Sequence, residues 1–318
     1  MRAVVFDGDL RFREDIPVPD PPKRWAQIRV LLAGICGTDK EILKGYQRFK
    51  GIPGHEFVGI VEQSDEKAWI GRRVVGEINV SCGWCRWCKK DLTGHCLHRK
   101  VLGINGLNGC MAEYCILPTS NLYRVPAVLS DEQAVLIEPL SAACRVAEQL
   151  QLTGAERVVV LGDGPLGILC AWVLRTVVSN VTLVGHHPHK LAVAKWHGTH
   201  ALEGTHEHLY GADIVLEATG SADGLREAIK VCRPRGTIVL KSTISTDEPM
   251  NLSPLVVNEQ TLLGSRCGNF ESAFQLLSRY PDLPLPKLLT ASYPIEHAKK
   301  AFDKVLNPDA LKVTIHFN

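Results

Sequence analysis

Short runs in which apolar and polar residues alternate, cut by glycine and proline, dominate the first part of the chain. Residues 3–6 and 27–32 are of this kind, and such alternation is typical of strands with one buried face. Residues 17–22 include four prolines and predict an extended connector, because proline cannot donate the backbone hydrogen bond of a helix. The pattern indicates a β-rich N-terminal domain.

Near Leu136 the pattern changes to continuous apolar runs separated by helical segments. A helical stretch at 138–150 leads into the apolar run 157–161, which is typical of a strand buried on both faces. Further strands are predicted at 181–184, 213–218, 237–240 and 260–264, with helical segments at 168–178 and 225–232. This alternation predicts an α/β class with a doubly wound Rossmann domain, that is, a parallel sheet with helices on both faces.

The last fifty residues predict a return to the first domain. A helix at 271–279, a proline-rich turn and a closing helix and strand ending at Phe317 follow Gly268. With 318 residues, the chain is long enough for two domains. We expect a β-rich domain from 1–140 and 269–318, with a small lobe at about 80–98, and a Rossmann domain from 141–268. The connection 201–212 leaves little room for a third strand and its helix.

Four cysteines with short, regular spacing predict a metal site in the lobe. Their thiolates can close a tetrahedron around Zn²⁺ at about 2.3 Å each, leaving no open position, so the site would be structural. The alternatives are disulfides or unrelated core thiols. Met1 leads directly into a strand pattern, unlike a secretory signal, so a reducing, cytoplasmic compartment favours the metal. The four residues are Cys82, Cys85, Cys88 and Cys96.

Composition excludes several classes of partner. The net charge of +2 gives no basis for binding nucleic acid or an acidic membrane surface. No apolar run reaches the ~18 residues of a membrane span. A small-molecule partner is therefore expected.

A glycine-rich turn between the first Rossmann strand and its helix predicts a dinucleotide site. Its glycines allow a tight turn and let the backbone approach a pyrophosphate at the positive end of the helix. A strand precedes the turn and an apolar helix comes after it, as this motif requires. The expected contacts are Gly162, Gly164, Pro165, Leu166 and Gly167. Thr219, after a later strand, is a further expected contact.

The end of the second Rossmann strand indicates which nucleotide is preferred. An acidic residue there would bind the ribose hydroxyls of NAD, but the sequence has Gly185 followed by histidines. His186, His187 and Lys190 could face a 2′-phosphate instead. We expect NADP to be preferred, with NAD still possible, because histidine is only partly charged near neutral pH.

Two short motifs in the β-rich domain supply a mixed set of metal-binding groups. Cys36, Thr38 and Asp39 form one, and His55 and Glu56 form the other. Thiolate, imidazole and carboxylate together suit a zinc ion with an open position. A single histidine is more often structural than a ligand, so these residues alone leave the assignment open.

The chain resembles zinc-dependent medium-chain dehydrogenases. The resemblance rests on these two motifs, the cysteine lobe and the glycine-rich turn, together with Ala112–Glu113–Tyr114 and Glu138–Pro139–Leu140. The resemblance covers essentially the whole length and is closest to glucose, sorbitol and threonine dehydrogenases. It implies a GroES-like catalytic domain beside the Rossmann domain. The zinc-free quinone-reductase branch lacks both the lobe and the ligand set.

The resemblance also implies a role for each catalytic residue. Cys36, His55 and Glu56 would form the inner shell of a catalytic zinc, with Glu138 joining directly or through a water. Asp39 would orient His55, and Thr38 would take the proton of the substrate hydroxyl. Where many relatives carry an outer histidine of the proton relay, this chain has Glu41.

The resemblance therefore implies an enzyme with two zinc ions per chain that transfers hydride between a CH–OH group and NAD(P). The expected substrate is a secondary alcohol, polyol or aldose. One alternative is a biosynthetic substrate such as a hydroxyethyl side chain or an amino alcohol, and another is a non-enzymatic sensor of the cofactor. The relatives imply a homodimer or homotetramer, commonly paired through the edge of the cofactor-domain sheet.

Overall fold

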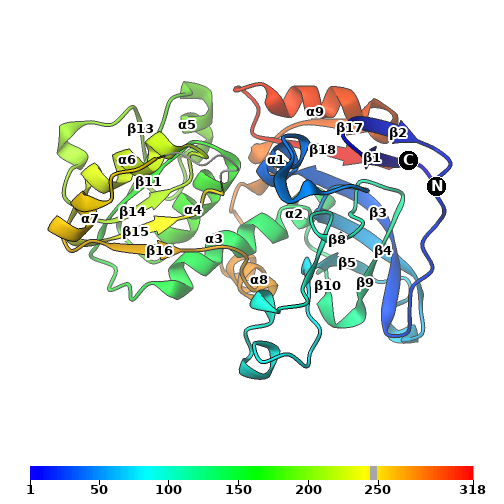
Figure 1. Ribbon diagram of the computed structural model, residues 1–318. Helices are drawn as coiled ribbons and strands as arrows, with labels where there is room; N and C mark the ends of the chain where they lie inside the picture. The colour runs from blue at the N-terminus through cyan, green and yellow to red at the C-terminus, as the bar shows by residue number, and fades with distance from the viewer. Residues whose placement is uncertain (244–248, 318) are drawn as a thin grey trace. The chain divides into compact units, whose positions relative to one another are not determined.

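The computed structural model describes residues 1–243 and 249–317, which form two compact units (Figure 1). One unit comprises Met1–Glu138 and Leu289–Asn318, and the other comprises Pro139–Leu288. The chain passes from the first unit to the second after Glu138, close to the expected boundary at residue 140. The chain returns to the first unit after Leu288 rather than after Gly268, so helix α8 (Phe270–Arg279) belongs to the Rossmann unit.

The first unit is built on a seven-stranded sheet whose centre is the long strand β3 (Trp25–Ile35). Strand β18 pairs antiparallel with β3, so the end of the chain does return to the first domain. The remaining order is β10-β5-β4 on one side of β3 and β18-β17 on the other, with β9 also paired to β3. Their bounds are β4 (Glu56–Ser64), β5 (Arg73–Gly76), β9 (Tyr114–Pro118), β10 (Leu122–Arg124), β17 (Leu289–Pro294) and β18 (Lys312–His316).

Smaller elements complete this unit. A hairpin of β1 (Ala3–Phe6) and β2 (Leu10–Arg13) shares a hydrophobic core with helix α9 (Ala298–Leu306) and strand β18. Helices α1 (Gly37–Leu43) and α2 (Asp131–Ala134) follow the sheet strands, and a three-stranded sheet joins the cysteine lobe: β6 (Asn79–Val80), β7 (Lys100–Leu102) and β8 (Gly106–Leu107).

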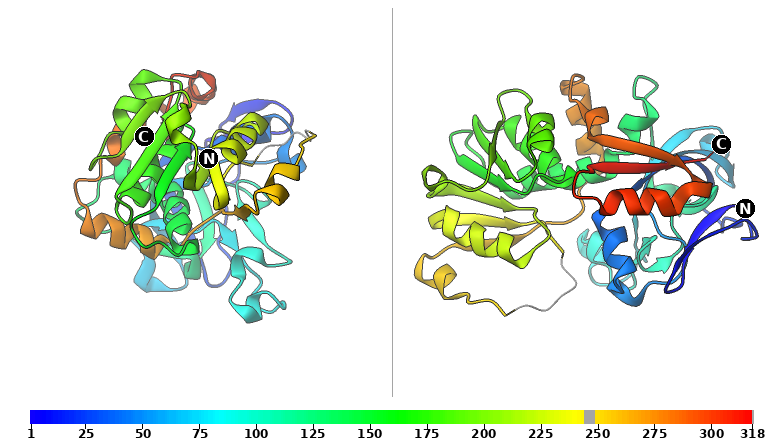
Figure 2. Two further views of the ribbon diagram at one scale, coloured as in Figure 1. Left: turned by 90° about the vertical axis from the view of Figure 1, so that its left-hand side faces the viewer. Right: turned by 90° about the horizontal axis from the view of Figure 1, so that it is seen from above.

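The second unit is the predicted parallel sheet, in the order β13-β12-β11-β14-β15-β16. Figure 2 shows this sheet from two further directions with helices packed against it. The strands are β11 (Arg157–Leu161), β12 (Asn180–Gly185), β13 (His200–Glu203), β14 (Ala212–Glu217), β15 (Cys232–Leu240) and β16 (Thr261–Gly264). Besides α8, the helices are α3 (Ile137–Gln149), α4 (Pro165–Arg175), α5 (Pro188–Ala194), α6 (Ala222–Val231) and α7 (Ser253–Val257).

One expectation about this sheet needs correction. The short connection 201–212 nevertheless holds a third strand, β13, which pairs parallel with β12. Only the helix after it is lost, reduced to a single 3-10 turn at Glu207–Leu209. A four-residue strand needs far less chain than a helix that crosses a sheet face. Among the described residues, no helix combines the length and apolar character needed to cross a bilayer.

Candidate active site and metal centres

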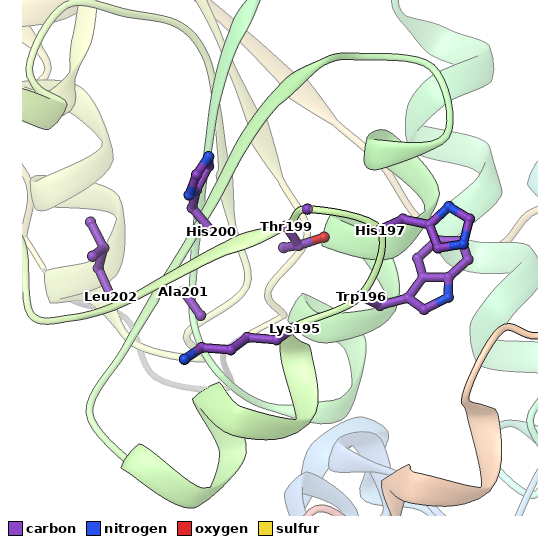
Figure 3. Close-up of a pocket in the computed structure, with 8 residues that line it drawn as sticks. Lys195, Trp196, His197, Thr199, His200, Ala201 and Leu202 are labelled. Atoms are coloured by element: carbon purple, nitrogen blue, oxygen red, sulfur yellow. The ribbon is translucent and has the colours of Figure 1, made fainter.

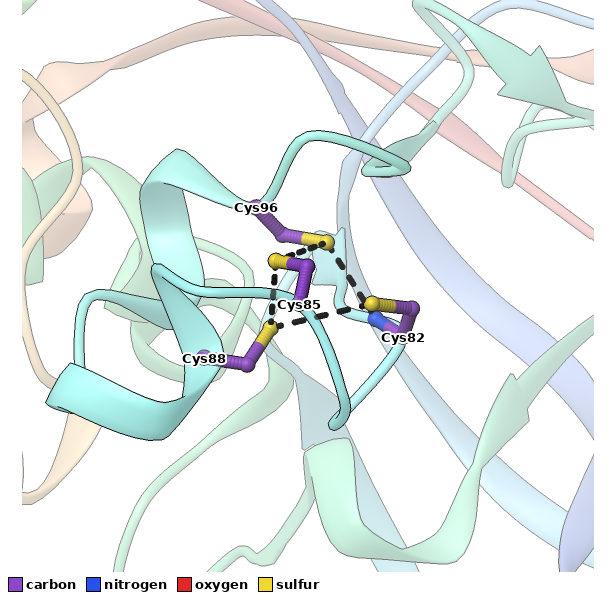
Figure 4. Close-up of side chains that lie close together, drawn as sticks. All are labelled: Cys82, Cys85, Cys88 and Cys96. Carbon is purple, nitrogen blue, oxygen red and sulfur yellow. Dashed lines mark hydrogen bonds between the residues drawn. The ribbon is translucent and has the colours of Figure 1, made fainter.

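The cysteine lobe brings its four thiols together, as their spacing predicts (Figure 4). Cys88 Sγ lies 3.5 Å from Cys85 Sγ and 4.0 Å from Cys82 Sγ, and Cys85 Sγ lies 3.8 Å from Cys96 Sγ. Four sulfurs about 2.3 Å from one zinc ion in a tetrahedron would lie about 3.8 Å apart. The thiols therefore fit Zn²⁺ and are too far apart for disulfide bonds.

The backbone around the lobe favours thiolates over thiols. The amide N–H groups of Cys82 and His98 both donate to Cys96 Sγ at 3.3 Å. Hydrogen bonds from the backbone, that of Cys88 foremost, lower the pKa of Cys85 to about 6. Burial nevertheless raises the pKa of Cys88 to about 11. Thiolate is the form that binds zinc, so the backbone prepares Cys85 and Cys96 for a metal, whereas Cys88 would lose its proton on binding it.

The second group lies at the junction of β3, α1 and β4. Cys36 follows β3 and is the N-cap of α1, while His55 directly precedes β4 and Glu56 begins it. Ligand atoms of these three residues all lie within 4.8 Å of one another. Two segments distant in sequence meet here because β3 pairs antiparallel with β4, placing Gly34 opposite Glu56.

Asp39 supports both loops of this group from a fully buried position. Its Oδ2 accepts the Cys36 N–H at 2.7 Å, which closes the N-terminus of α1, and its Oδ1 accepts the Gly54 N–H at 3.2 Å. The His55 Nδ1 lies 3.6 Å from Asp39 Oδ1, beyond hydrogen-bond distance. Burial raises the pKa of Asp39, although the neighbouring imidazole of His55 offsets part of this.

In the part of the chain that the structure describes, the buried Nδ1 of His55 has no hydrogen-bond partner. Burial alone would lower the pKa of His55, but the carboxylate of Asp39 and the thiol of Cys36 raise it well above its usual value. A metal ion at the Cys36 side would therefore displace a proton from this ring. The donor set of thiolate, imidazole and carboxylate fits Zn²⁺.

Glu56 has a partner that lies far away in the sequence. The Nζ of Lys312, on β18, donates to both carboxylate oxygens at 2.7 and 2.6 Å and to the Ile35 carbonyl at 3.2 Å. Burial by itself would lower the pKa of Lys312, but the charge of Glu56 reverses the effect and raises it. This lysine therefore balances the charge of Glu56 inside the protein.

Thr38 and Glu138 lie around this group rather than in it. The Cys36 thiol is 3.8 Å from Thr38 Oγ1, so the hydroxyl is next to the expected metal. Glu138 is close enough to contribute to the raised pKa of His55. Among the described residues, it is not part of the compact ligand cluster.

The glycine-rich turn has the geometry that its motif predicts. Gly162 has φ +113, and a Cβ there would lie 2.5 Å from the Ala218 carbonyl. A Cβ on Gly167 would collide with the Gly162 carbonyl. Helix α4 begins at Pro165 with Gly164 as its N-cap, three residues before the predicted start, because proline at N1 is already set for the helix.

The end of β12 contains a group that the sequence analysis missed. Asp163, from the glycine-rich turn, accepts the backbone N–H groups of His186 and His187 at 2.7 and 2.8 Å. Its carboxylate also lies 2.9 Å from His187 Nδ1. The carboxyl ends of adjacent parallel strands lie at the same edge of a sheet. The acid in the glycine-rich turn could therefore have been expected, from the sequence, to lie beside the end of β12.

The other expected cofactor residues differ in exposure. His186 is exposed and His187 half-buried, whereas Lys190 is buried at the start of α5. Thr219 is exposed at the end of β14, where its backbone N–H and its hydroxyl donate to Glu217 Oε1 at 2.7 and 2.6 Å. Glu217 thereby fixes the turn at the carboxyl edge of the sheet.

A hollow of about 510 Å³ in the Rossmann unit involves none of these residues. It is lined by residues 195–202, with Trp196 and His197 stacked at one end (Figure 3). Both side chains hydrogen-bond Asp282. No predicted catalytic or cofactor residue lines this hollow.

A β-rich unit with a Cys/His/Glu cluster and a closed four-cysteine lobe, together with a Rossmann unit, defines the class of zinc-dependent dehydrogenases. The family comparisons agree. Residues 22–127 match the Alcohol dehydrogenase GroES-like domain, and residues 131–317 match the Glucose dehydrogenase C-terminus. The chain therefore belongs to the zinc-type medium-chain alcohol and polyol dehydrogenases, which are NAD(P)-dependent oxidoreductases acting on CH–OH groups.

Similar proteins span nearly the whole chain. An L-threonine 3-dehydrogenase of Coxiella burnetii is 30% identical, covering 95% of this chain and 94% of its own. A sorbitol dehydrogenase of Halalkalibacterium halodurans is 29% identical with the same coverage. The crystal structure of a short chain alcohol dehydrogenase (rspB) from E. coli CFT073, complexed with NADH, is 27% identical with a TM-score of 0.90, covering 100% of this chain and 99% of its own.

Proposed function

We propose that this enzyme is a zinc-dependent dehydrogenase of secondary alcohols, polyols or aldoses that prefers NADP and also accepts NAD. The observation that carries the proposal is the cluster of the half-buried Cys36 with the buried His55 and Glu56, whose ligand atoms lie within 4.8 Å of one another. A cofactor sensor would have no use for such a mixed, incomplete metal shell.

Cys36, His55 and Glu56 would hold the catalytic zinc, and Glu138 would join them directly or through a water. The lobe of Cys82, Cys85, Cys88 and Cys96 would hold a second, structural zinc. When bound, the catalytic zinc supplies Lewis acidity toward the substrate oxygen and the nicotinamide supplies the hydride acceptor.

The protein's own residues orient the reactants and move the proton. Thr38, beside the Cys36 thiol, would take the proton of the substrate hydroxyl and pass its own hydroxyl proton on toward the cofactor ribose. Asp39 holds the Cys36 and Gly54 backbones in place. Its carboxylate lies 3.6 Å from His55 Nδ1 without a hydrogen bond, so it would orient the imidazole through its charge. Lys312 balances the charge of Glu56, and both side chains are almost fully buried.

The cofactor proposal rests on the glycine-rich turn and on the imidazoles that come after β12. Gly162, Gly164, Pro165, Leu166 and Gly167 would hold the pyrophosphate at the N-terminus of α4. His186 and His187 would face a 2′-phosphate, with Lys190 and Thr219 as further contacts. The NADH complex of the similar E. coli protein supports NAD as the second cofactor.

The relatives' names point to two substrate classes. A sorbitol dehydrogenase favours a polyol or sugar, whereas the L-threonine 3-dehydrogenases favour an amino alcohol. Residues 131–317 match the Glucose dehydrogenase C-terminus, which makes polyols and sugars the first candidates.

Metal analysis and a substrate screen test the proposal together. The expected metal content is two zinc ions per chain, falling to one in Cys36→Ser. The expected kcat/KM for oxidation of a polyol or aldose is higher with NADP than with NAD. A metal count near one in the wild type, unchanged in Cys36→Ser, would refute the catalytic site. A clearly higher kcat/KM with NAD than with NADP on the same substrate would refute the cofactor preference.

We also propose a homodimer or homotetramer paired through β16. This strand is an edge of the Rossmann sheet, so its outer backbone groups have no neighbouring strand in the described chain. Val256 and Val257 on the adjacent helix α7 are 78% and 79% exposed. A second copy would cover both the strand edge and these side chains.

A reducing, cytoplasmic compartment is proposed from the cysteines. All eleven lie in the described chain and none forms a disulfide. Five of the eleven are the proposed zinc ligands Cys36, Cys82, Cys85, Cys88 and Cys96, which must stay reduced to bind the metal, as in a reducing compartment.

A further inference from the structure

The acid that Rossmann enzymes commonly place at the end of their second strand is missing here, because β12 ends at Gly185. The structure nevertheless places a carboxylate at this strand end. It belongs to Asp163, which stands between two glycines of the G-x-G-x-x-G turn after the neighbouring strand β11. The acid is thus supplied by a different strand.

The fit between Asp163 and Gly185 is specific. A Cβ built on Gly185 would meet three atoms first, namely the Cβ, Cγ (2.6 Å) and Oδ2 of Asp163, all far inside normal contact distance. The carboxylate therefore begins where a side chain at position 185 would begin. Only glycine at 185 leaves the room for it.

The hydrogen bonds of this carboxylate leave it able to accept more. Oδ2 accepts two backbone N–H groups and faces His187 Nδ1 at 2.9 Å, whereas among the described residues Oδ1 has only the 3.2 Å contact to the same ring nitrogen. The side chain is 10% exposed. A carboxylate oxygen has two acceptor sites, so Oδ1 can accept a hydroxyl donated from outside.

We propose that Asp163 determines the balance between the two cofactors, by accepting a hydrogen bond from an adenosine ribose hydroxyl of NAD and by opposing the 2′-phosphate of NADP. The inference rests on the proposed dinucleotide site and adds a residue to it. It explains how NAD remains usable although the second strand ends without an acid. His186 and His187 favour NADP, and Asp163 limits that preference.

Dissociation constants of NADH and NADPH, measured by calorimetry on the metal-loaded protein, test the role of Asp163 without turnover. Asp163→Asn keeps an oxygen for the loop N–H groups but removes the charge. Because a hydrogen bond to a charged group contributes about 1.5–3 kcal/mol, NADH should bind about tenfold or more weakly. NADPH should bind unchanged or more tightly.

A charge-relocation variant separates recognition from loop support. Asp163→Gly combined with Gly185→Asp moves the acid to the strand end, and the atoms that obstruct a Cβ at 185 are then gone. This double variant should return the ratio of the two dissociation constants to within about threefold of wild type. Asp282→Asn is the matched control, because Asp282 also pairs with a histidine, His197 at 2.9 Å, away from the turn; it should change neither constant.

Each result either supports the inference or overturns it. If Asp163→Asn weakens both cofactors equally, or leaves the ratio within threefold, Asp163 only supports the loop and the inference is wrong. It is equally wrong if the folded double variant keeps the ratio of Asp163→Asn. If the wild-type protein binds neither nucleotide, the proposed cofactor site itself is wrong. This outcome is seen in the wild type, whereas a wrong role for Asp163 is seen only in the variants, so the two failures are distinguishable.

Discussion

The buried pair of Lys312 and Glu56 gives the sharpest test of how the candidate zinc site is held. Both side chains are almost fully buried, at 4% and 0% exposure, and the Lys312 Nζ contacts both carboxylate oxygens. Lys312→Met removes the cation while keeping most of the aliphatic volume. The Glu56 carboxylate would then be buried with no counter-charge.

The expected cost in the metal-free protein is about 3–5 kcal/mol of unfolding free energy, because removing one partner leaves an uncompensated buried charge. Lys44→Met is the matched control. Lys44 Nζ lies 2.8 Å from Glu41 Oε1, but its side chain is 63% exposed. An exposed pair of this kind contributes less than about 1 kcal/mol.

Urea unfolding of chelator-treated protein, followed by circular dichroism, measures both variants. Lys312→Met/Glu56→Gln should be more stable than the sum of the two single changes predicts, because neither charge remains buried alone. Zinc should restore part of the loss in Lys312→Met, since Glu56 can turn to the metal, and should restore none in Lys44→Met. Equal losses in Lys312→Met and Lys44→Met would refute the reasoning.

Three further predictions concern other parts of the molecule. Cys96→Ser should lower the zinc content from two to one per chain and lower the Tm, while a Tm equal to wild type would contradict a structural zinc. Val257→Lys should yield monomers by light scattering if α7 and β16 form the interface, and an unchanged mass would exclude it. Hydrogen bonds from Thr153 lower the pKa of Glu156 to about 2, so its stabilisation is present above its ordinary pKa of ~4.3 and is lost as the pH falls toward 2. Glu156→Gln should therefore make the free energy of unfolding less dependent on pH over that range, as measured by unfolding at a series of acid pH values. The same pH dependence as wild type would contradict a lowered pKa of Glu156.

The sequence predicts the local parts of this protein well. The cysteine lobe closes within fifteen residues, so its spacing alone determines which thiols meet. The buried strands of the Rossmann sheet follow from continuous apolar runs, and β11 has the predicted bounds. Such features depend on neighbours along the chain, which a periodic pattern records.

Contacts between distant strands leave a weaker signal in one sequence. Lys312 reaches Glu56 only because β18 pairs with β3 and β3 pairs with β4. No local pattern in the sequence records that strand order, so the sequence alone does not pair this lysine with Glu56. Asp163 is an intermediate case: β11 and β12 were both predicted, and their parallel pairing places the acid beside Gly185.

One steric rule connects the two candidate sites. On β3, a Cβ at Gly34 would collide with the Glu56 carboxylate, and on β12 a Cβ at Gly185 would collide with that of Asp163. Each carboxylate thus occupies space that a glycine on the neighbouring strand leaves open. Strand glycines weaken a sheet by roughly 0.5–1 kcal/mol. Glycine nevertheless stands at both positions, because any larger side chain would occupy the space of the carboxylate. The two acids, rather than strand stability, therefore determine that residues 34 and 185 are glycine.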